Sequence, residues 1–465
     1  MEVLSLALAF LIVSLTISFF VVRNGSDVGS RLPPGGSGLP FVGETLDFFL
    51  NPEKFIRDRM KKHSPDIFRT NFFGEKIVVI CGPNGHKFLW SNESKYFTSF
   101  YPESMKKLFL SNQPKRLIRE EDLKVIRSGP GVLKPESLAH NLAEMDSIIQ
   151  QQLKIHLEGK SEVTIHPFSN AVTFTLACRF FMGTENPERI AKLIGHFNKI
   201  IEGIHSLPLN FPGTAFYNAC RAADVIRKEL ATVIKEKIDA AGVVGSPSRD
   251  MLSALISSGY MSDAEISDKV MGTLVAGYTT VATTMTFFMK YVGERPEVYH
   301  KVLTEQLEIS KAKQPGEALC WEDMQKMKYS WAVICEVMRL APPLIGSFRE
   351  AMTDFTYAGY TVPKGWKVFW TVNTTQKNPK YFPEPNKFDP SRFLEGDAPL
   401  AYTYLPFGGG PKLCPGKEYA RIVVLAFVHN MVKKYKWSLI DPREKISGSM
   451  MPVPEKGLPV RLYPH

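Results

Sequence analysis

The longest pattern of apolar positions in the chain predicts one helix of 31 residues, from Asp263 to Gly293. The run Ser262-Asp263-Ala264-Glu265 has the spacing of a capping box, which is typical of a helix start, and Pro296 lies beyond the other end. Residues 270–289 carry no charge, which leaves two interpretations, a membrane span or a helix through the centre of a large core. Six threonines, a tyrosine and two glycines make this stretch polar for lipid and favour the core helix.

The remaining patterns place a small sheet beside many helices. A helix is predicted over residues 51–62, followed by strands over residues 68–71 and 76–81 that are joined through Gly74. Residues 82–85 read Gly-Pro-Asn-Gly, a turn signal, and helical patterns dominate from Pro83 to about Tyr299. Strands return around residues 355–360 and 367–372 and near the C-terminus. The predicted fold class is therefore mostly α with a minor antiparallel β-sheet region.

The N-terminus has the pattern of a membrane anchor. Residues 3–22 carry no charge, and at about 1.5 Å per residue they span roughly 30 Å, the thickness of a hydrocarbon core. Arg23 and Arg31 follow, so the positive-inside rule places the rest of the chain in the cytosol. A cleaved secretory signal is the alternative, although the run is long for one. We predict a transmembrane anchor over residues 1–22, a proline-rich hinge over 23–43 and one large domain over 44–465.

Composition excludes some classes of protein. The net charge of +10 is modest for 465 residues and is not gathered in one block, so it predicts no nucleic-acid partner and fits a membrane surface or an acidic protein at least as well. The six cysteines are widely spaced and form no CxxC pair. A zinc site or a disulfide framework is therefore disfavoured, and a reducing compartment is indicated.

One cysteine lies in a loop that suits a metal ligand. The run from Phe407 to Gly416 reads Phe-Gly-Gly-Gly-Pro-Lys-Leu-Cys-Pro-Gly, and a helix-forming pattern follows it over residues 417–434. Backbone N–H groups and the helix N-terminus would stabilise a Cys414 thiolate. Gly410 and Gly416 would let the backbone pass close to a flat cofactor. An ordinary turn with a buried structural cysteine remains open at this point.

Two further motifs are weak when taken singly. Gly277, Thr279 and Thr280 interrupt the middle of the long helix, where they suit either a small ligand or a notch filled by a neighbouring side chain. Glu336 and Arg339 share one helix face at i, i+3 and can pair. Their apolar flanks favour a buried pair over the more common solvated one.

In their order along the chain these motifs resemble the cytochrome P-450 family of haem-thiolate monooxygenases. The cysteine signature F-x-x-G-x-basic-x-C-x-G is highly specific, and Glu-x-x-Arg and Arg392, in Phe-Asp-Pro-Ser-Arg-Phe, precede it in the family's order. The resemblance covers nearly the whole chain and implies the P-450 fold behind an N-terminal transmembrane helix. It also implies haem b (iron protoporphyrin IX), with NADPH electrons delivered by NADPH-cytochrome P-450 reductase.

The resemblance implies a role for each matching residue. Cys414 would be the axial iron ligand. Glu336, Arg339 and Arg392 would form the structural triad behind the haem. Thr280 would position dioxygen and relay protons, while Thr279 stands where the family usually has an acid, so that proton delivery must differ. The other implied cofactor-binding residues are Arg349, Lys412, Phe407, Gly410, Gly416, Lys124 and Arg127.

A closer resemblance, to plant oxidases of triterpenes such as beta-amyrin or dammaranes, rests on four stretches, residues 39–46, 210–215, 327–331 and 407–421. It implies an apolar terpenoid substrate, and the predicted pocket walls are Leu274, Ala276, Gly277, Leu344, Ile345, Met450 and Met451. A basic face of Lys412, Lys417, Arg421, Lys433, Lys434 and Lys436 would meet the reductase.

The function predicted is hydroxylation or further oxidation of a triterpenoid in the endoplasmic reticulum membrane, by a single-pass protein with a cytosolic catalytic domain. Three alternatives remain: an enzyme that rearranges hydroperoxides without a reductase, a hydroxylase of taxanes or sterols, and a haem sensor or carrier. The skeleton and the carbon that is oxidised do not follow from the sequence.

Overall fold

The computed structural model describes residues 31–36, 38–39, 43–72, 74–110, 131–241, 250–259, 261–314, 316–394, 398–448 and 450–465. The predicted anchor over residues 1–22 lies outside these ranges. By their internal contacts the residues group into two compact units. Unit 1 holds the described residues within 31–100, 345–383 and 400–411, and unit 2 holds those within 101–344, 384–399 and 412–465.

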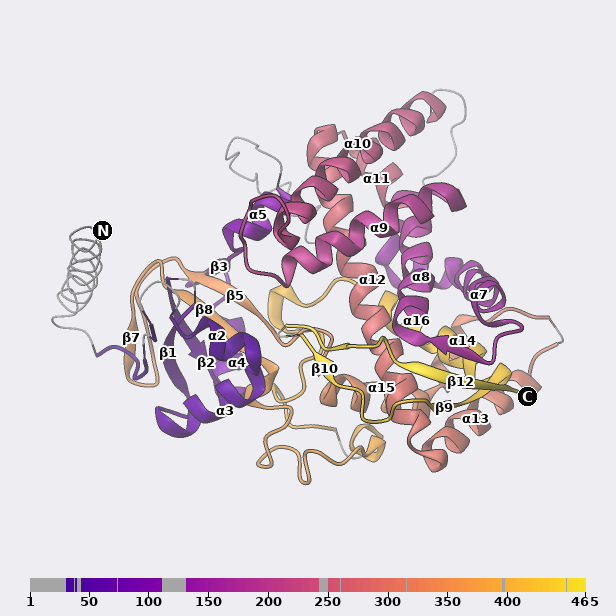
Figure 1. Ribbon diagram of the computed structural model, residues 1–465. Helices are drawn as coiled ribbons and strands as arrows, with labels where there is room; N and C mark the ends of the chain where they lie inside the picture. Colours follow the sequence, from indigo (N-terminus) through magenta and orange to yellow (C-terminus); the bar gives the residue numbers. More distant parts are fainter. Residues whose placement is uncertain are drawn as a thin grey trace, which may run out of the picture. The chain divides into compact units, whose positions relative to one another are not determined.

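Unit 1 is built on a five-stranded sheet with the order β1-β2-β8-β5-β3 (Figure 1). Its strands are β1 Ile67–Phe72, β2 Glu75–Ile80, β3 Phe97–Ser99, β5 Gly346–Ala351 and β8 Lys367–Thr371. All neighbouring strands are antiparallel except β2 and β8, which are parallel, with Ile77 opposite Lys367. The predicted antiparallel character is thus right for three of the four pairings. A hairpin of β6 Phe355–Tyr357 and β7 Tyr360–Val362 completes the strands of this unit.

The helices of unit 1 are short. They are α2 Thr45–Leu50, α3 Pro52–Lys62 and α4 Gly82–Ser91, followed by the 3-10 turn η3 Val372–Thr374. The helical pattern predicted from Pro83 is confirmed by α4, whereas the turn predicted over residues 82–85 is wrong, because these residues open that helix. Proline is favoured in the first turn of a helix, where its missing N–H costs nothing. Part of the predicted hinge is bound to the sheet, since the Arg69 N–H donates to Pro34 O over 2.9 Å.

Unit 2 is mostly helical. Its helices are α5 Glu103–Phe109, α7 Pro135–Leu157, α8 Ile165–Ala177, α9 Pro187–Ile204, α10 Ala215–Ala241, α11 Met251–Ser258, α12 Asp263–Gly293, α13 Pro296–Lys311, α14 Trp321–Lys326, α15 Lys328–Leu340 and α16 Lys417–Lys434. A π-helical turn, η2 Cys178–Met182, continues α8, and the 3-10 turns are η1 Gly131–Leu133 and η4 Pro390–Phe393. The 3-10 turn η5 Gly410–Lys412 crosses the boundary between the units.

Short strands complete unit 2. They form a three-stranded antiparallel sheet, β4-β12-β9, from Glu162–Thr164, Pro459–Pro464 and Tyr435–Leu439. A second pair joins β10 Ile446–Ser447 to β11 Val453–Pro454. These are the strands predicted near the C-terminus.

The helix α12 has the predicted bounds and runs through the core of unit 2 (Figure 1). The capping box is present: the Glu265 N–H donates to Ser262 Oγ, and the Ser262 N–H donates to Glu265 Oε2 over 2.8 Å. The helix packs against α8, α10, α15 and α16. Within the described ranges, no helix combines the length and the apolar character needed to cross a bilayer. Of the two interpretations of residues 270–289, the core helix is therefore the one supported.

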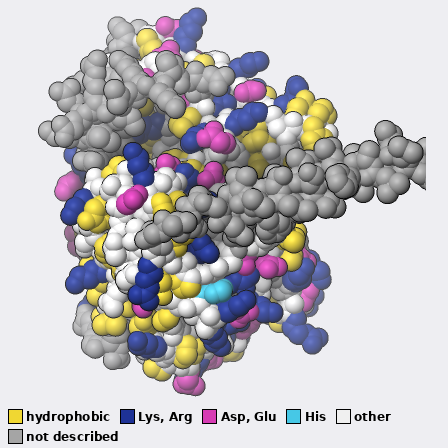
Figure 2. All heavy atoms as spheres, turned by 90° about the vertical axis from the view of Figure 1, so that its left-hand side faces the viewer, with side chains coloured by type: hydrophobic (Ala, Val, Ile, Leu, Met, Phe, Trp, Pro, Cys, Tyr) yellow, Lys and Arg dark blue, Asp and Glu magenta, His cyan; other side chains and the backbone are white. Residues whose placement is uncertain are grey.

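Charge is mixed on the face drawn in Figure 2. Lys and Arg side chains there are interspersed with Asp and Glu and with hydrophobic side chains. The positive balance of the chain is not gathered into one block on the described part of that face.

Candidate active site

Cys414 is an exposed residue in the loop just before α16. Of the six cysteines, all free, Cys81, Cys178 and Cys335 are buried, whereas Cys414 is exposed. The surrounding loop desolvates its sulfur and raises the pKa of the thiol, and the Gly416 N–H, which donates to the sulfur, lowers it in part. Metal coordination would deprotonate such a thiol outright. This arrangement supports the metal ligand over the buried structural cysteine.

The donor set fits an iron porphyrin better than a bare metal ion. Among the described residues, no group of three His, Cys, Asp or Glu side chains could hold a metal. A haem iron takes its equatorial nitrogens from the porphyrin and needs only one axial ligand from the protein, which Cys414 can supply. A Cβ built on Gly416 would meet only the Cys414 sulfur, at 3.9 Å, so this glycine leaves the space at the thiol open.

The preceding glycines of the loop belong to unit 1, where they pack on tryptophan. A Cβ on Gly410 would lie 2.6 Å from Trp90 Cβ, and one on Gly409 would lie 2.7 Å from Trp90 Cζ3. Gly410 also has φ +65°, which favours glycine. Close packing on Trp90, in addition to the predicted approach of a cofactor, thus accounts for Gly410. Phe407 is half-buried and Lys412 is exposed; their predicted contacts with haem stay predictions.

Glu336 and Arg339 form a fully buried, bidentate ion pair on α15. Arg339 Nε lies 2.6 Å from Glu336 Oε2, and Nη2 lies 2.8 Å from Oε1; both side chains are 0% exposed. Arg339 also donates from Nη1 to Pro385 O, over 2.8 Å, and from Nη2 to Lys387 O, over 3.2 Å. The pair therefore ties α15 to the segment that leads into η4.

Arg392 approaches the same carboxylate from η4. Its Nε lies 3.6 Å from Glu336 Oε1, and its Nη2 donates to Glu384 O over 3.2 Å. The Asp389 N–H also donates to Glu336 Oε1, over 2.8 Å. The structure thus brings the three triad residues together around one buried carboxylate.

One face of α12 stays open inside an otherwise buried helix. Ala276 is exposed and Thr280 half-buried, although most of the helix from Tyr278 onward is buried. At about 100° per residue, Lys269, Thr273, Ala276 and Thr280 share this face, which we call the open stripe. The Thr280 hydroxyl donates to Ala276 O over 2.8 Å.

Thr279 lies off the open stripe. Its side chain is 6% exposed, and its hydroxyl donates to Val275 O over 3.0 Å. Neighbouring residues on a helix point about 100° apart, so Thr279 and Thr280 cannot both face the same space. Of the two predicted catalytic threonines, Thr280 is the one with access to a ligand on the stripe.

Phe181 fills the notch at Gly277. A Cβ on Gly277 would lie 2.5 Å from Phe181 Cε2, and Phe181 is 1% exposed. Its ring packs against Tyr419 with the centroids 5.1 Å apart, so it has little room to move. The helix-packing interpretation of this glycine, rather than its predicted place in the substrate pocket, accounts for the contact.

We expect Gly277→Ala to destabilise the protein by about 1–3 kcal/mol through overpacking against Phe181, outweighing the gain in helix propensity of about 1 kcal/mol. The measurement is urea unfolding of the holoprotein. Gly272→Ala is the matched control, because its nearest neighbour, Phe109 Cδ1, is 4.0 Å away. Equal stability of the two variants would contradict the packing role.

The other predicted pocket walls are scattered. Leu274 is fully buried and lies about 200° around the helix from Ala276, so it faces away from the open stripe. Leu344 is 45% exposed in unit 2, whereas Ile345 is 6% exposed in unit 1. Met450 is half-buried and Met451 is buried in unit 2. Of the predicted walls on α12, Ala276 alone lies within the stripe.

Arg349 has a protein partner that the sequence did not indicate. Its Nε lies 2.9 Å from Glu93 Oε1 and 3.1 Å from Oε2, and Glu93 is itself buried in unit 1. Arg349 Nη1 donates to Ser347 Oγ and Phe348 O. Its role toward a haem propionate stays a prediction. Lys124 and Arg127 lie outside the described residues.

The predicted basic face is not one surface. Helix α16 separates Lys417 from Lys434 by 17 residues, about 26 Å. Arg421 is engaged by Glu418, 3.4 Å away, and lies over the Trp331 ring. Lys433 Nζ lies 3.1 Å from His429 Nε2. The length of the helix therefore divides the cations between its two ends.

The sequence did not lead us to predict Lys269 as a site residue, although it directly precedes the uncharged run of α12. Burial lowers the pKa of its ammonium, and no carboxylate among the described residues pairs with it. It shares the open stripe with Thr280, about 16 Å along the axis. The spacing of Lys269, Thr273, Ala276 and Thr280 places them on one helix face, and this spacing could have indicated Lys269 from the sequence.

Comparison with known proteins agrees with this geometry. A model of the cytochrome P450 family matches residues 33–459. Beta-amyrin 28-monooxygenase of Medicago truncatula is 46% identical over 474 residues, which cover 99% of this chain and 98% of that protein. Two proteins of Solanum lycopersicum are each 44% identical to this chain. The match to beta-amyrin 28-monooxygenase covers 100% of this chain and 99% of that protein. The match to beta-amyrin 6-beta-monooxygenase covers 98% of both.

A solved structure shares the fold. Retinoic acid-bound cyanobacterial CYP120A1 superposes with a TM-score of 0.83 at 31% identity, covering 94% of this chain and 100% of that one. The family model spans nearly all of the chain beyond the predicted anchor, and the relatives match along their whole length. This chain, with its exposed Cys414 and its buried Glu336–Arg339 pair, belongs to the cytochrome P450 family.

Proposed function

We propose that this cytochrome P450 monooxygenase hydroxylates, or oxidises further, a carbon of a triterpenoid, using dioxygen and NADPH electrons passed by a reductase. The observation that carries the substrate class is the identity of 44–46% to beta-amyrin monooxygenases along nearly the full length of both chains. The open stripe on α12, with Ala276 as its exposed apolar centre, agrees with an apolar substrate.

Overall similarity does not select the carbon. The 28- and the 6-beta-monooxygenase of Solanum lycopersicum are both 44% identical to this chain, yet their names give different positions on one skeleton. A single methyl group in a pocket is worth only about 1–3 kcal/mol of discrimination. The position oxidised is therefore set by individual wall residues.

The roles of the residues follow from their positions. Cys414 would hold the haem iron, and the bound haem supplies the activation of dioxygen. The Thr280 hydroxyl lies on the open stripe. Its O–H donates to Ala276 O, and its oxygen can at the same time accept a hydrogen bond from a water molecule. Thr279, buried and bonded to Val275 O, carries no charge and lies on another face. Protons must therefore reach Thr280 through solvent rather than through an adjacent carboxylate.

Thr280→Ala is expected to lower the product formed per NADPH by about tenfold or more, because a positioned proton donor contributes about 10²–10⁴ to such steps. NADPH consumption should continue. The measurement compares NADPH oxidation, hydrogen peroxide and product in the reconstituted system. Thr279→Ala is the paired variant, and its product formed per NADPH should fall less than that of Thr280→Ala. If Thr280→Ala stays coupled and Thr279→Ala does not, the proton role belongs to Thr279.

The proposal is tested by incubating purified holoprotein with a plant reductase, NADPH and a panel of triterpenes that includes beta-amyrin. Product that requires both NADPH and reductase supports the monooxygenase and excludes a haem carrier. Turnover of a fatty-acid hydroperoxide without NADPH would instead identify a hydroperoxide-rearranging enzyme. Turnover of taxanes or sterols with no triterpene product would overturn the substrate class.

We also propose a single-pass anchor at residues 1–22 in the endoplasmic reticulum membrane, with the catalytic body in the cytosol. The support is the uncharged run of residues 3–22 followed by Arg23 and Arg31. Deleting residues 1–22 should move the protein from the microsomal to the soluble fraction. Protection of the body from added protease in intact microsomes would contradict the orientation.

A further inference from the structure

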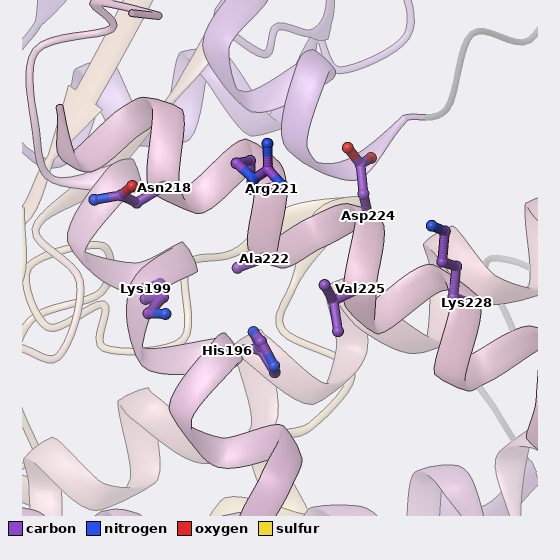
Figure 3. A pocket seen from close by; sticks show the side chains of 8 residues that line it. All are labelled: His196, Lys199, Asn218, Arg221, Ala222, Asp224, Val225 and Lys228. Carbon is purple, nitrogen blue, oxygen red and sulfur yellow. The ribbon is translucent and has the colours of Figure 1, made fainter. Parts of the chain in front are cut away.

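The antiparallel helices α9 and α10 border a cavity that is open to solvent and takes no part in the site described above. The two helices pack side by side in unit 2 (Figure 1). The cavity has a volume of about 390 Å³ and is lined from α9 by His196 and Lys199 (Figure 3). Its lining from α10 consists of Asn218, Arg221, Ala222, Asp224, Val225 and Lys228. A water occupies about 30 Å³ in the liquid, so the cavity has room for a polyatomic ion.

Toward the start of α9 the seam between these helices is neutralised. Arg189 lies 2.9 Å from Glu229 and 2.8 Å from Glu236, and Lys192 lies 3.2 Å from Glu229. Each cation on α9 there meets a carboxylate on α10. The sequence thus supplies acidic partners in register at this end of the seam.

At the cavity this pairing stops. Lys199, Arg221 and Lys228 are exposed, and none of them has a carboxylate within ion-pair distance among the described residues. The one acid in the lining, Asp224, pairs with Arg227 outside it, over 3.4 Å. Three cations therefore surround a space with one carboxylate that is already engaged, and the local potential favours an anion.

His196 has a buried nitrogen that needs a partner. Its Nδ1 is inaccessible to solvent and has no hydrogen-bond partner among the described residues. Burial lowers the pKa of the imidazole, and Lys199 and Lys192 lower it further. Because Nδ1 is closed to solvent, an anion in the cavity would accept a hydrogen bond from the other ring nitrogen, Nε2, and would offset the two lysines.

The connection between the helices adds an apolar surface near the cavity. Leu207, Leu209 and Phe211 are 49%, 49% and 55% exposed. Lys199 lies five residues before the end of α9, about 7.5 Å along its axis. A phosphate beside exposed apolar side chains is the arrangement that suits the headgroup of a phospholipid.

We propose that the cavity between α9 and α10 binds a phosphate group, carried by an anionic phospholipid or by a free phosphate compound. Lys199, Arg221 and Lys228 neutralise its charge, and the ring of His196 donates one hydrogen bond from inside the seam. This is a binding site separate from Cys414 and from the open stripe, and it does not depend on which triterpenoid is oxidised.

The experiment follows the titration of His196 in the full-length holoprotein by NMR with histidine-selective ¹³C labelling. Inorganic phosphate is the first probe, with chloride at equal ionic strength as its reference. The second probe is reconstitution in vesicles of phosphatidylcholine alone or with phosphatidic acid. We expect phosphate to raise the titration midpoint of His196 by roughly one pH unit, because an anion favours the imidazolium. His205, at the end of α9, is the internal reference for a general surface effect.

The variants make the outcome decisive. Lys199→Glu with Arg221→Glu should abolish the shift and weaken phosphate binding, measured by calorimetry, by at least tenfold. Lys154→Glu with Lys364→Glu changes the net charge equally at exposed positions elsewhere. This control should leave the His196 shift and phosphate binding unchanged. A shift with phosphatidic acid identifies the lipid as the source, and a shift with inorganic phosphate alone identifies a free phosphate. If neither probe moves His196 more than His205, the site does not exist.

Discussion

Replacing Cys414 with alanine is expected to lower turnover by more than about a hundredfold, the upper end of the losses seen when a group that merely orients a metal ligand is changed. Cys414 is the exposed one of the six cysteines and lies in the loop just before α16. Cys414 would hold the haem iron, and its thiolate would supply the electron density that favours O–O cleavage. The measurement is the carbon monoxide difference spectrum of the reduced protein, together with product formation.

The matched control is Cys220→Ala, which also removes a partly accessible cysteine, here from α10. It should keep the thiolate-type Soret band and full turnover. If Cys414→Ala retained that band while another cysteine variant lost it, the ligand would have to be reassigned.

Glu336→Gln is expected to lower the free energy of unfolding by about 3–5 kcal/mol, the cost of leaving a buried charge without its partner. Arg339 is fully buried, and it also donates to the neutral carbonyls of Pro385 and Lys387. Since a domain is stable by only about 5–15 kcal/mol, much of the variant should fail to retain haem at 37 °C. Chemical unfolding followed by fluorescence, with the haem content of purified protein, provides the measurement.

Glu103→Gln is the control, because Glu103 and Lys106 form a pair with the same i, i+3 spacing but with side chains 86% and 41% exposed. Glu103→Gln should lower the free energy of unfolding by less than about 1 kcal/mol. Arg339→Lys keeps the charge but not the bidentate contact, and should fall between the two. If Glu336→Gln were no less stable than Glu103→Gln, the pair would not be what ties α15 to the segment before η4.

Local signals determined the elements that carry the site. The bounds of α12 follow from a capping box at Ser262 and from the absence of a break before Gly293. The bounds of α16 follow from the apolar run after Gly416. The cysteine loop was recognised because its signature is specific, whereas the Glu336–Arg339 pair is a weak signal alone and gained weight from its place before that loop. The family, and with it the haem and the monooxygenase class, could therefore be predicted from the sequence.

One local signal pointed two ways. Gly82 and Pro83 are as typical of a helix start as of a turn, and α4 begins there, as the helical pattern from Pro83 predicted. The parallel pairing of β2 with β8 joins residues nearly 300 positions apart, so no pattern within either strand could indicate it.

Contacts between distant residues decided the rest of the site. Phe181 occupies the notch at Gly277 from another helix, and Glu93 binds Arg349 from a segment 256 residues away. Neither contact leaves a mark on the local sequence, because a buried aromatic ring or a carboxylate can satisfy many partners. The same holds for the cavity between α9 and α10, where the cations of two helices meet only after packing.

Cys414 and its loop could thus be singled out from the sequence alone, since the proposed metal ligand, the helix after it and the glycines lie within a few residues of one another. Which threonine of α12 faces the open stripe was decided by the tertiary structure. Thr279 and Thr280 are chemically identical neighbours, and only the packing of α12 against its surroundings buries the first, at 6% exposure, and leaves the second accessible.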